Sequence, residues 1–320
     1  MSADHDRLRS PVRLFMATIL AMLPALVSAQ TQVTPPKNKF TPEQDVQLGR
    51  EAAAQAEQQL PLIGDAQVQD YIDRLGRRLV DHAPPELDQP AFDYSFRVVN
   101  QKEINAFALP GGPMFVNRGM IEAARNEDEV AGVMAHELGH VLLRHGTANL
   151  TKAQKFQWGA LAGAIAGAIV GGSAGQVIAD GSQIGLGTWL LKYSREYEKQ
   201  ADLLGAQIMA RAGYDPRALA TMFETIERQS GSGGPQWLSS HPNPGNRTAY
   251  ILREADQLEV SGRQQDSREF DRIRAKFARM APAPTAEQIS RRARTRSSAT
   301  ARTRSLTAPN PDSSRQGSWR

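Results

Sequence analysis

The sequence predicts an α+β fold that is mostly α-helical, with a small β-sheet and one long helix that carries a His-Glu-x-x-His pattern. Apolar residues recur at helical spacing in most segments between residues 41 and 279. Alternating, β-rich stretches lie within residues 92–116, so we expect the sheet to be small. Abundant alanine and glycine, with only 6% aromatic residues, predict helices that pack closely through small side chains.

Composition and charge exclude several classes of protein. The 320 residues include no cysteine, which excludes disulfides, thiol catalysis and thiolate metal sites, so His, Asp or Glu must hold any metal. The net charge is +4, but residues 291–320 hold eight arginines and one aspartate, and the rest of the chain is net acidic. Because the basic charge belongs to this tail, we expect no nucleic acid as a partner.

Residues 1–29 have the features of a secretory signal peptide. Arginines precede an apolar run over residues 14–27, which ends at the small-residue cleavage site Val27-Ser28-Ala29. The alternative is an uncleaved membrane anchor, but a run of about 14 residues is shorter than the roughly 20 that a spanning helix needs. We therefore expect secretion into the periplasm and a mature chain that begins at Gln30, with residues 30–40 as a linker.

Two helices are expected next. Thr41 suits the N-cap and Pro42 the first position of a helix that reaches Leu60. Gly49 lies on the apolar face of this helix and permits a close neighbour. A second helix is expected over residues 65–80, where apolar residues again recur at helical spacing.

The sheet is expected from two segments. Residues 92–99 alternate and are rich in β-formers, which predicts a strand. Residues 106–116 predict a second extended segment, interrupted by Pro110 and Pro113. Because proline cannot donate to a strand ladder, we place this segment at a sheet edge or at the rim of a hairpin.

The most regular helical pattern covers residues 126–144. Asn126 suits its N-cap and Glu129 lies at the third helical position, which predicts a capping box. Further helices are expected at residues 188–212, 215–229, 245–256 and 267–279. Gly213 is expected to end the first of these in a left-handed conformation. Residues 281–320 are rich in Pro, Ala, Ser, Thr and Arg, and we expect them to be disordered.

Residues 158–187 form a separate glycine- and alanine-rich segment. Its glycines recur every four residues, which permits close contact between helices. The apolar run is about 15 residues long, which is short for a membrane span. We expect a helical hairpin that packs on the main domain, with peripheral membrane contact as a further expectation and a spanning helix as the less favoured alternative.

The motif that carries chemistry is His136-Glu137-Leu138-Gly139-His140. Residues four apart lie about 40° apart around a helix axis, so both imidazoles face the same way and can share one zinc ion. The Glu137 carboxylate can reach a water at the metal without being a ligand. A catalytic zinc needs a third protein ligand. His145 is expected to face away, about 140° round the helix, so that ligand must come from elsewhere.

Glu198 is the best candidate for the third ligand. It lies four residues before Asp202 on the helix expected over residues 188–212, so both carboxylates share a helix face. Asp202 suits an outer partner that accepts the free ring N–H of His136 or His140. On composition alone, however, a solvated acidic helix face explains these two residue types better.

Taken in order, these motifs resemble the HtpX / CAAX prenyl protease 1 family of zinc metallopeptidases over roughly residues 41–256. The matching segments are short but highly specific as an ordered set: residues 105–112, 127–132, 136–140, 194–202 and 240–242, followed by Arg247. The sequence is most similar to the secreted, periplasmic branch, of the β-barrel assembly-enhancing protease type. It departs from that branch in lacking a helical-repeat domain, so we do not expect partners to be recruited through such repeats.

The resemblance implies a zincin-type metallopeptidase domain over residues 41–280, with one zinc ion per chain. The implied ligands are His136, His140 and Glu198. The implied catalytic base is Glu137, which would take a proton from a water that zinc activates.

His241 and Arg247 are candidates for stabilising the oxyanion, because the resemblance places their segment near the metal. His241 has two other interpretations. It is either a turn residue beside Pro242, or a fourth zinc ligand that holds the enzyme latent until substrate displaces it. The sequence leaves these alternatives open.

The resemblance also gives a role to Asn105, Ala106, Phe107 and Ala108. An edge strand beside the zinc-binding helix can pair with an extended peptide through its backbone, which would make side-chain selectivity loose. A purely structural hairpin is the alternative.

Together these features predict a secreted zinc metalloendopeptidase that hydrolyses peptide bonds of misfolded or stalled envelope proteins. Its partners would be unfolded or misassembled protein substrates. The alternative is a zinc-stabilised periplasmic chaperone or assembly factor with little proteolysis. Glu137 favours the peptidase, because a structural zinc site is usually closed and needs no base.

Overall fold

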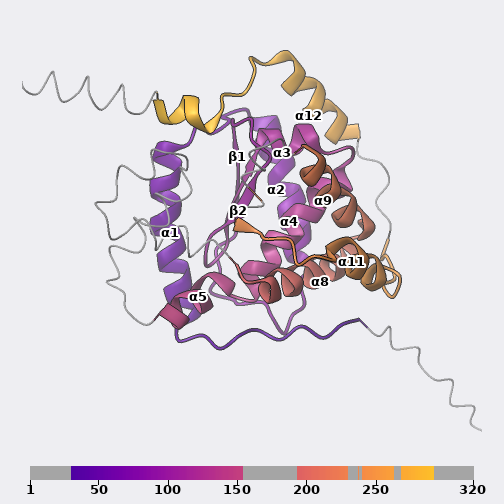
Figure 1. Ribbon diagram of the computed structural model, residues 1–320. Coiled ribbons are helices and arrows are strands. Elements are labelled where there is room, and N and C mark those ends of the chain that lie inside the picture. The colour runs from indigo at the N-terminus through magenta and orange to yellow at the C-terminus, as the bar shows by residue number, and fades with distance from the viewer. Residues whose placement is uncertain (1–29, 154–192, 230–236, 238–239, 263–267, 292–320) are drawn as a thin grey trace, which may run out of the picture.

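The computed structural model describes residues 30–153, 193–229, 237, 240–262 and 268–291. Within these residues a small three-stranded sheet lies between one helix on its first face and a larger group of helices on its second face (Figure 1). This arrangement is the mostly helical α+β fold that the sequence predicts. The expected signal peptide, the glycine-rich segment and most of the arginine-rich tail lie outside the described residues.

Helix α1 (Pro42–Gln59) covers the first face of the sheet. Its N-cap forms a complete capping box, in which the Gln44 N–H donates to the Thr41 hydroxyl at 3.3 Å and the Thr41 N–H donates to Gln44 Oε1 at 2.9 Å. A Cβ added to Gly49 would lie only 1.8 Å from the carbonyl oxygen of Pro110. The close neighbour expected at this glycine is therefore the loop that joins two strands.

Helix α2 (Ala66–Asp81) packs on the second face. Its N-cap Asp65 accepts hydrogen bonds from the N–H groups of Gln67 and Val68. The helix buries the residues whose spacing predicted it: Val68, Tyr71, Ile72, Leu75 and Leu79. They join the larger of the hydrophobic clusters, which fixes α2 against the sheet.

The sheet has the strand order β1-β3-β2. Strand β1 (Ser95–Val99) runs parallel to β3 (Pro113–Asn117), and β2 (Ala106–Ala108) runs antiparallel to β3. Strand β2 lies at an edge and β3 in the centre, and the two form a hairpin, so Pro110 and Pro113 lie at a hairpin rim, which was one of the two expected positions. Pro113 is tolerated there because it is the first residue of its strand.

Helix α3 (Arg118–Ala123) follows β3 directly and was not predicted. Helix α4 (Glu127–Leu142) is the long helix that carries the His-Glu-x-x-His motif. Its N-cap Asn126 accepts a hydrogen bond from the Glu129 N–H at 3.0 Å. The other half of the predicted capping box is absent, because the Glu129 carboxylate accepts from the Arg125 N–H at 2.7 Å instead.

Helix α5 (His145–Ala153) follows α4 after a break in the helical path and was not predicted. Helix α8 (Arg195–Arg211) begins later than the expected residue 188, because the Ser194 side chain caps it by accepting from the Tyr197 N–H. It ends before Gly213, which has the expected left-handed conformation with φ 85°.

Three further helices lie close to their expected positions: α9 (Arg217–Gln229), α11 (Arg247–Ala255) and α12 (Arg268–Arg279). Helix α4 packs against α8 and α9, and α11 packs against both of these, so the long helix is buried on several sides. Within the described residues, no helix is both long enough and apolar enough to cross a membrane.

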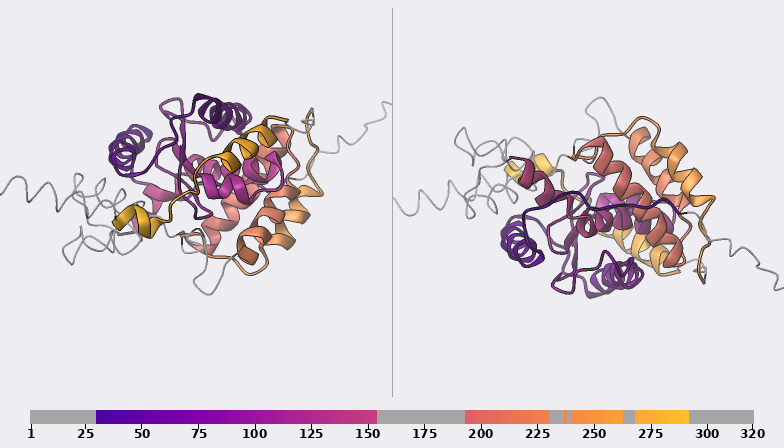
Figure 2. Two further views of the ribbon diagram at one scale, coloured as in Figure 1. Left: turned by 90° about the horizontal axis from the view of Figure 1, so that it is seen from above. Right: turned by 90° about the horizontal axis from the view of Figure 1, so that it is seen from below.

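Residues 30–40, expected as a linker, lie along the domain as a strap. They cross the face of α8 as the indigo segment in the right-hand view of Figure 2. Here the side-chain amide of Gln207 donates to the Thr31 carbonyl at 2.8 Å. The segment is therefore attached to the helix that it crosses.

Residues 281–291 also pack on the domain. The Lys102 N–H donates to the Pro284 carbonyl at 3.0 Å, and the Arg118 guanidinium donates to the Ala281 carbonyl at 2.8 Å. These hydrogen bonds hold residues 281–284 against the domain, beyond the boundary that the sequence places at residue 281.

Candidate metal centre

Helix α4 supplies three side chains to a buried polar group. His136, Glu137 and His140 are all buried, and the Nε2 atoms of the two imidazoles lie 3.1 Å apart. Helix α8 approaches this point closely because glycines line the contact. A Cβ on Gly139 would lie 3.0 Å from the backbone of α8, and one on Gly205 would lie 3.0 Å from the backbone of α4.

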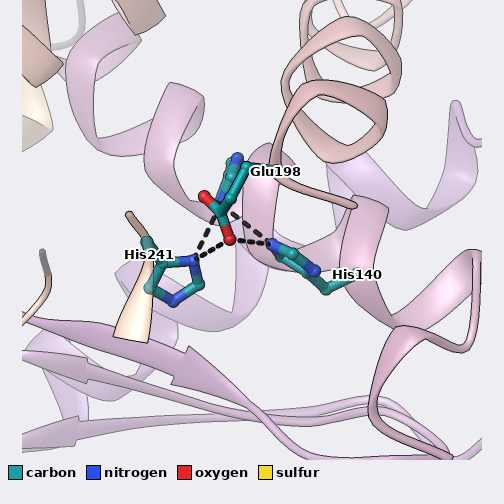
Figure 3. Close-up of side chains that lie close together, drawn as sticks. His140, Glu198 and His241 are labelled. Carbon is teal, nitrogen blue, oxygen red and sulfur yellow. Dashed lines mark hydrogen bonds and ion pairs between the residues drawn. The ribbon is translucent and has the colours of Figure 1, made fainter. Parts of the chain in front are cut away.

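Helix α8 brings Glu198 to the same point. Its carboxylate oxygens lie 3.4 Å from His140 Nε2 (Figure 3) and 3.6 Å from His136 Nε2. Glu198 is 0% exposed, so it does not belong to a solvated acidic face. Burial alone would raise its pKa, but His241, His140 and Arg247 outweigh burial and hold the pKa well below its ordinary value.

His241 joins these residues from the segment that precedes α11. Its Nδ1 lies 3.1 Å from Glu198 Oε1 and 3.2 Å from His136 Nε2. One potential ligand atom from each of the three histidines and Glu198 lies within 4.8 Å of all the others. The structure thus places His140, Glu198 and His241 around one point, as Figure 3 shows.

Glu137 stands beside this group. Its Oε1 accepts a hydrogen bond from Trp237 Nε1 at 3.3 Å and lies 3.4 Å from His241 Nε2. Burial lowers the pKa of His241, but the charges of Glu198 and Glu137 outweigh it and raise the pKa above its ordinary value. A buried carboxylate next to a cluster of imidazoles has the position that a general base requires.

The donor set fits a zinc ion, which takes imidazole nitrogens and carboxylate oxygens. His136 Nδ1 lies 2.8 Å from Asp202 Oδ1. Burial raises the pKa of Asp202, but Arg247 and His136 outweigh burial and lower it, so this oxygen is an acceptor. The proton of His136 therefore lies on Nδ1, and Nε2 presents a lone pair to the group. Within the described ranges, no other set of His, Asp and Glu has this arrangement.

Arg247, at the first position of α11, contacts both acidic side chains. Its guanidinium donates to the Asp202 oxygens at 2.7 and 2.8 Å and to Glu198 Oε2 at 2.9 Å. The cation also lies 3.8 Å from the centre of the Phe223 ring, and the Tyr250 hydroxyl donates to the same Asp202. These contacts fit a residue that positions the carboxylates, whereas the sequence made Arg247 a candidate for stabilising the oxyanion.

His145 contradicts the expectation that it faces away from the motif. Helix α4 ends at Leu142, and Arg144 has a positive φ of 56°, so the chain turns before His145. His145 Nδ1 then lies 2.9 Å from His140 Nδ1, and its ring stacks on Tyr197 with the centroids 4.2 Å apart. The expected rotation of about 140° between His140 and His145 holds only for one continuous helix, and the turn at Arg144 interrupts that helix. Burial lowers the pKa of His145 to about 3.

The four residues expected to bind substrate lie beside α4. Ala106, Phe107 and Ala108 form β2, and Asn105 precedes it. Among the described strands, β2 pairs only with β3, so its other edge faces away from the sheet. A small cavity at the carboxyl end of β2 is lined by Ala108 and by the candidate ligand His140. The end of β2 and one candidate ligand therefore line the same cavity.

Two aromatic residues of the site were not predicted from the sequence. Tyr193 stacks on His140 with 3.8 Å between the ring centroids, and Trp237 stacks on His241 with 4.5 Å between them. Trp237 lies four residues before His241, and this spacing could have indicated that the two side chains are neighbours. Tyr193 lies outside any helix, and no periodic pattern indicates it.

Comparison with known proteins agrees with this geometry. The model of a family described as Peptidase family M48 matches residues 66–255. A β-barrel assembly-enhancing protease of Escherichia coli K12 is 32% identical over 220 residues, which are 67% of this chain and 44% of that protein. The protein of the same name from Yersinia pestis is 29% identical over 264 residues, 76% of this chain and 54% of its own length. The mitochondrial metalloendopeptidase OMA1 of Arabidopsis thaliana is 33% identical over 163 residues, which are 51% and 31% of the two chains. This chain thus spans about half or less of the length of these relatives.

Proposed function

This chain belongs to peptidase family M48, and from that premise we propose that it is a zinc-dependent metalloendopeptidase. The observation that carries the proposal is the buried group of two imidazoles and the Glu198 carboxylate, with the Glu137 carboxylate beside it. The proposed ligands are His136, His140 and Glu198, and the proposed general base is Glu137.

Each residue of the group can take a specific role in the hydrolysis of a peptide bond. Zinc, when bound, supplies a Lewis acid that polarises a peptide carbonyl and lowers the pKa of water. Glu137 takes a proton from the attacking water and returns it to the leaving nitrogen. The Trp237 indole N–H donates to Glu137 at 3.3 Å, which holds the carboxylate in one orientation while leaving its second oxygen available.

His241 is proposed as a latch rather than as an oxyanion donor. Its Nδ1 lies among the ligand atoms, where a catalytic zinc site would keep one position open for water or substrate. An oxyanion donor would instead lie about 3 Å beyond that position. Hydrolysis by this chain therefore requires His241 to move away when substrate enters.

A site with four potential ligands and no open position also supports a second candidate function. Four protein ligands are typical of structural zinc sites, which agrees with a zinc-stabilised chaperone that cleaves little. Glu137 favours the peptidase, because a structural site gains nothing from an additional buried carboxylate, and burying a charge is costly.

The proposed substrates are unfolded or misassembled proteins of the bacterial envelope. Strand β2 supports this, since an edge strand binds extended chains through their backbone and so suits substrates that have lost their fold. The name of the E. coli and Yersinia relatives, β-barrel assembly-enhancing protease, points to the same class. The signal-like residues 1–29 support a periplasmic location, and residues 158–187 remain the proposed site of peripheral membrane contact.

Metal content and casein digestion together test this function. The purified chain should hold about one zinc ion, and a His136→Ala, Glu198→Ala double variant should hold none. Casein digestion should stop when a chelator removes the metal and resume when zinc is added. A chain that suppresses casein aggregation with zinc bound but never cleaves it would support the chaperone and refute the peptidase.

A further inference from the structure

The two histidines of the motif have different outer partners. A histidine that binds a metal usually donates its second ring N–H to a carboxylate or a carbonyl. His136 follows this rule, because its Nδ1 lies 2.8 Å from Asp202. His140 departs from it, because its Nδ1 lies 2.9 Å from the Nδ1 of another imidazole, His145. A hydrogen bond between two such nitrogens requires that one of them carries a proton and the other does not.

Gln200 determines which nitrogen carries that proton. Its side-chain oxygen lies 3.0 Å from His145 Nε2, and an amide oxygen only accepts, so His145 Nε2 is the donor. His145 is 0% exposed and its ring nitrogens bond His140 and Gln200, neither of which is a carboxylate. An unpaired buried charge is unfavourable, so the ring is neutral and its Nδ1 must be the acceptor.

The N-terminal strap, residues 30–40, fixes the orientation of the Gln200 amide. The Gln200 nitrogen donates to the Thr34 carbonyl at 3.2 Å. If the amide were rotated by 180°, its oxygen would face that carbonyl oxygen and its N–H would face the N–H of His145, so both hydrogen bonds would be lost. The strap crosses α8, as the right-hand view of Figure 2 shows.

The ring plane of His145 is fixed as well. The Tyr197 ring lies parallel to it, with an angle of 2° between the planes and 4.2 Å between the centroids. Tyr197 and Gln200 are three residues apart on α8 and therefore lie on the same face of that helix. A single face of α8 thus sets both the plane and the hydrogen-bonding direction of His145.

We propose that Gln200 and His145 are positioning residues that hold His140 with its proton on Nδ1, so that the Nε2 lone pair points to the metal centre. The Thr34 carbonyl is the outer end of this relay. The strap is therefore part of the metal site, although it contributes no ligand. This inference rests on the proposed function only for the identity of the ion that His140 binds.

Zinc affinity in two variants tests the relay. Gln200→Leu removes the acceptor for His145, whereas Gln207→Leu breaks another contact with the strap two turns along α8. Competition with a chelator should show zinc binding about 10-fold weaker in Gln200→Leu, the lower end of the usual loss for an outer partner. Gln207→Leu should retain wild-type affinity. Equal affinity in Gln200→Leu and wild type, or equal losses in Gln200→Leu and Gln207→Leu, would overturn the relay.

Nitrogen-15 NMR of the histidine rings gives a second readout that a merely structural role would not change. In the metal-free wild type, His145 should carry its proton on Nε2 and none on Nδ1. In Gln200→Leu this preference should be lost. A wild-type His145 with a proton on Nδ1 would overturn the inference. If the wild type binds no zinc, the proposed function fails, whereas the position of the His145 proton still decides the relay.

Discussion

Arg247 donates hydrogen bonds to the carboxylates of both Glu198 and Asp202, at distances of 2.7 to 2.9 Å. It thereby links a proposed zinc ligand to the residue that orients His136. Both carboxylates are 0% exposed, and a cation bonded to them offsets much of the unfavourable free energy of burying negative charge.

Replacing Arg247 with methionine should therefore weaken zinc binding. We expect a loss of roughly 10- to 100-fold, the usual range for an outer partner of a metal ligand, measured by competition with a chelator. Arg253, an exposed arginine on the same helix, provides the matched control, and Arg253→Met should leave the affinity unchanged. A folded Arg247→Met protein with wild-type zinc affinity would show that Arg247 does not position the ligands.

The two interpretations of His241 predict opposite changes in rate. If His241 is a latch, His241→Ala should increase the basal rate of casein cleavage, because the position that its Nδ1 occupies becomes open. If it stabilises the oxyanion, the rate should fall by roughly 100-fold or more. The measurement is the initial rate with zinc occupancy checked in the same sample, and His82→Ala, at the end of α2, is the control. A fall in rate with zinc retained would rule out the latch.

Gly49 lets α1 pack closely against the loop between β2 and β3, so a side chain at this position should destabilise the fold. A side chain at this position would meet the Pro110 carbonyl, which is backbone and cannot rotate away. Gly49→Ala should therefore lower the free energy of unfolding by about 1–3 kcal/mol, the usual range for overpacking. Gly64→Ala is the matched control, since nothing lies within 4 Å of its added Cβ, and its effect should stay within about 0.5 kcal/mol. Equal unfolding midpoints in urea for the two variants would contradict this packing.

Most of the described helices, though not α3 and α5, could be predicted because their signals are local. Thr41 caps its helix as expected, and Gly213 ends α8 in the left-handed conformation. The central position of β3 could not be predicted, since the strand that pairs with its other side comes earlier in the chain and is parallel to it. Proline indicates an edge only on average, and Pro113 satisfies the same rule by standing first in its strand.

The site was predictable to the extent that it depends on spacing within one helix. His136 and His140 share a face for that reason, and so do Glu198 and Asp202. His145 was misplaced because a single turn at Arg144 changed the direction of the chain. The role proposed for Gln200 depends on contacts with two distant segments, which no local pattern in the sequence reveals.

Peptidase activity of a Glu137→Gln variant tests the central claim most directly. An amide cannot take a proton from water, so this variant should bind zinc as tightly as the wild type, unfold at the same denaturant concentration and cleave casein at a rate reduced by at least about 100-fold. The measurement compares initial cleavage rates of the two proteins at equal zinc occupancy. A Glu137→Gln protein that cleaves casein at the wild-type rate would contradict the account.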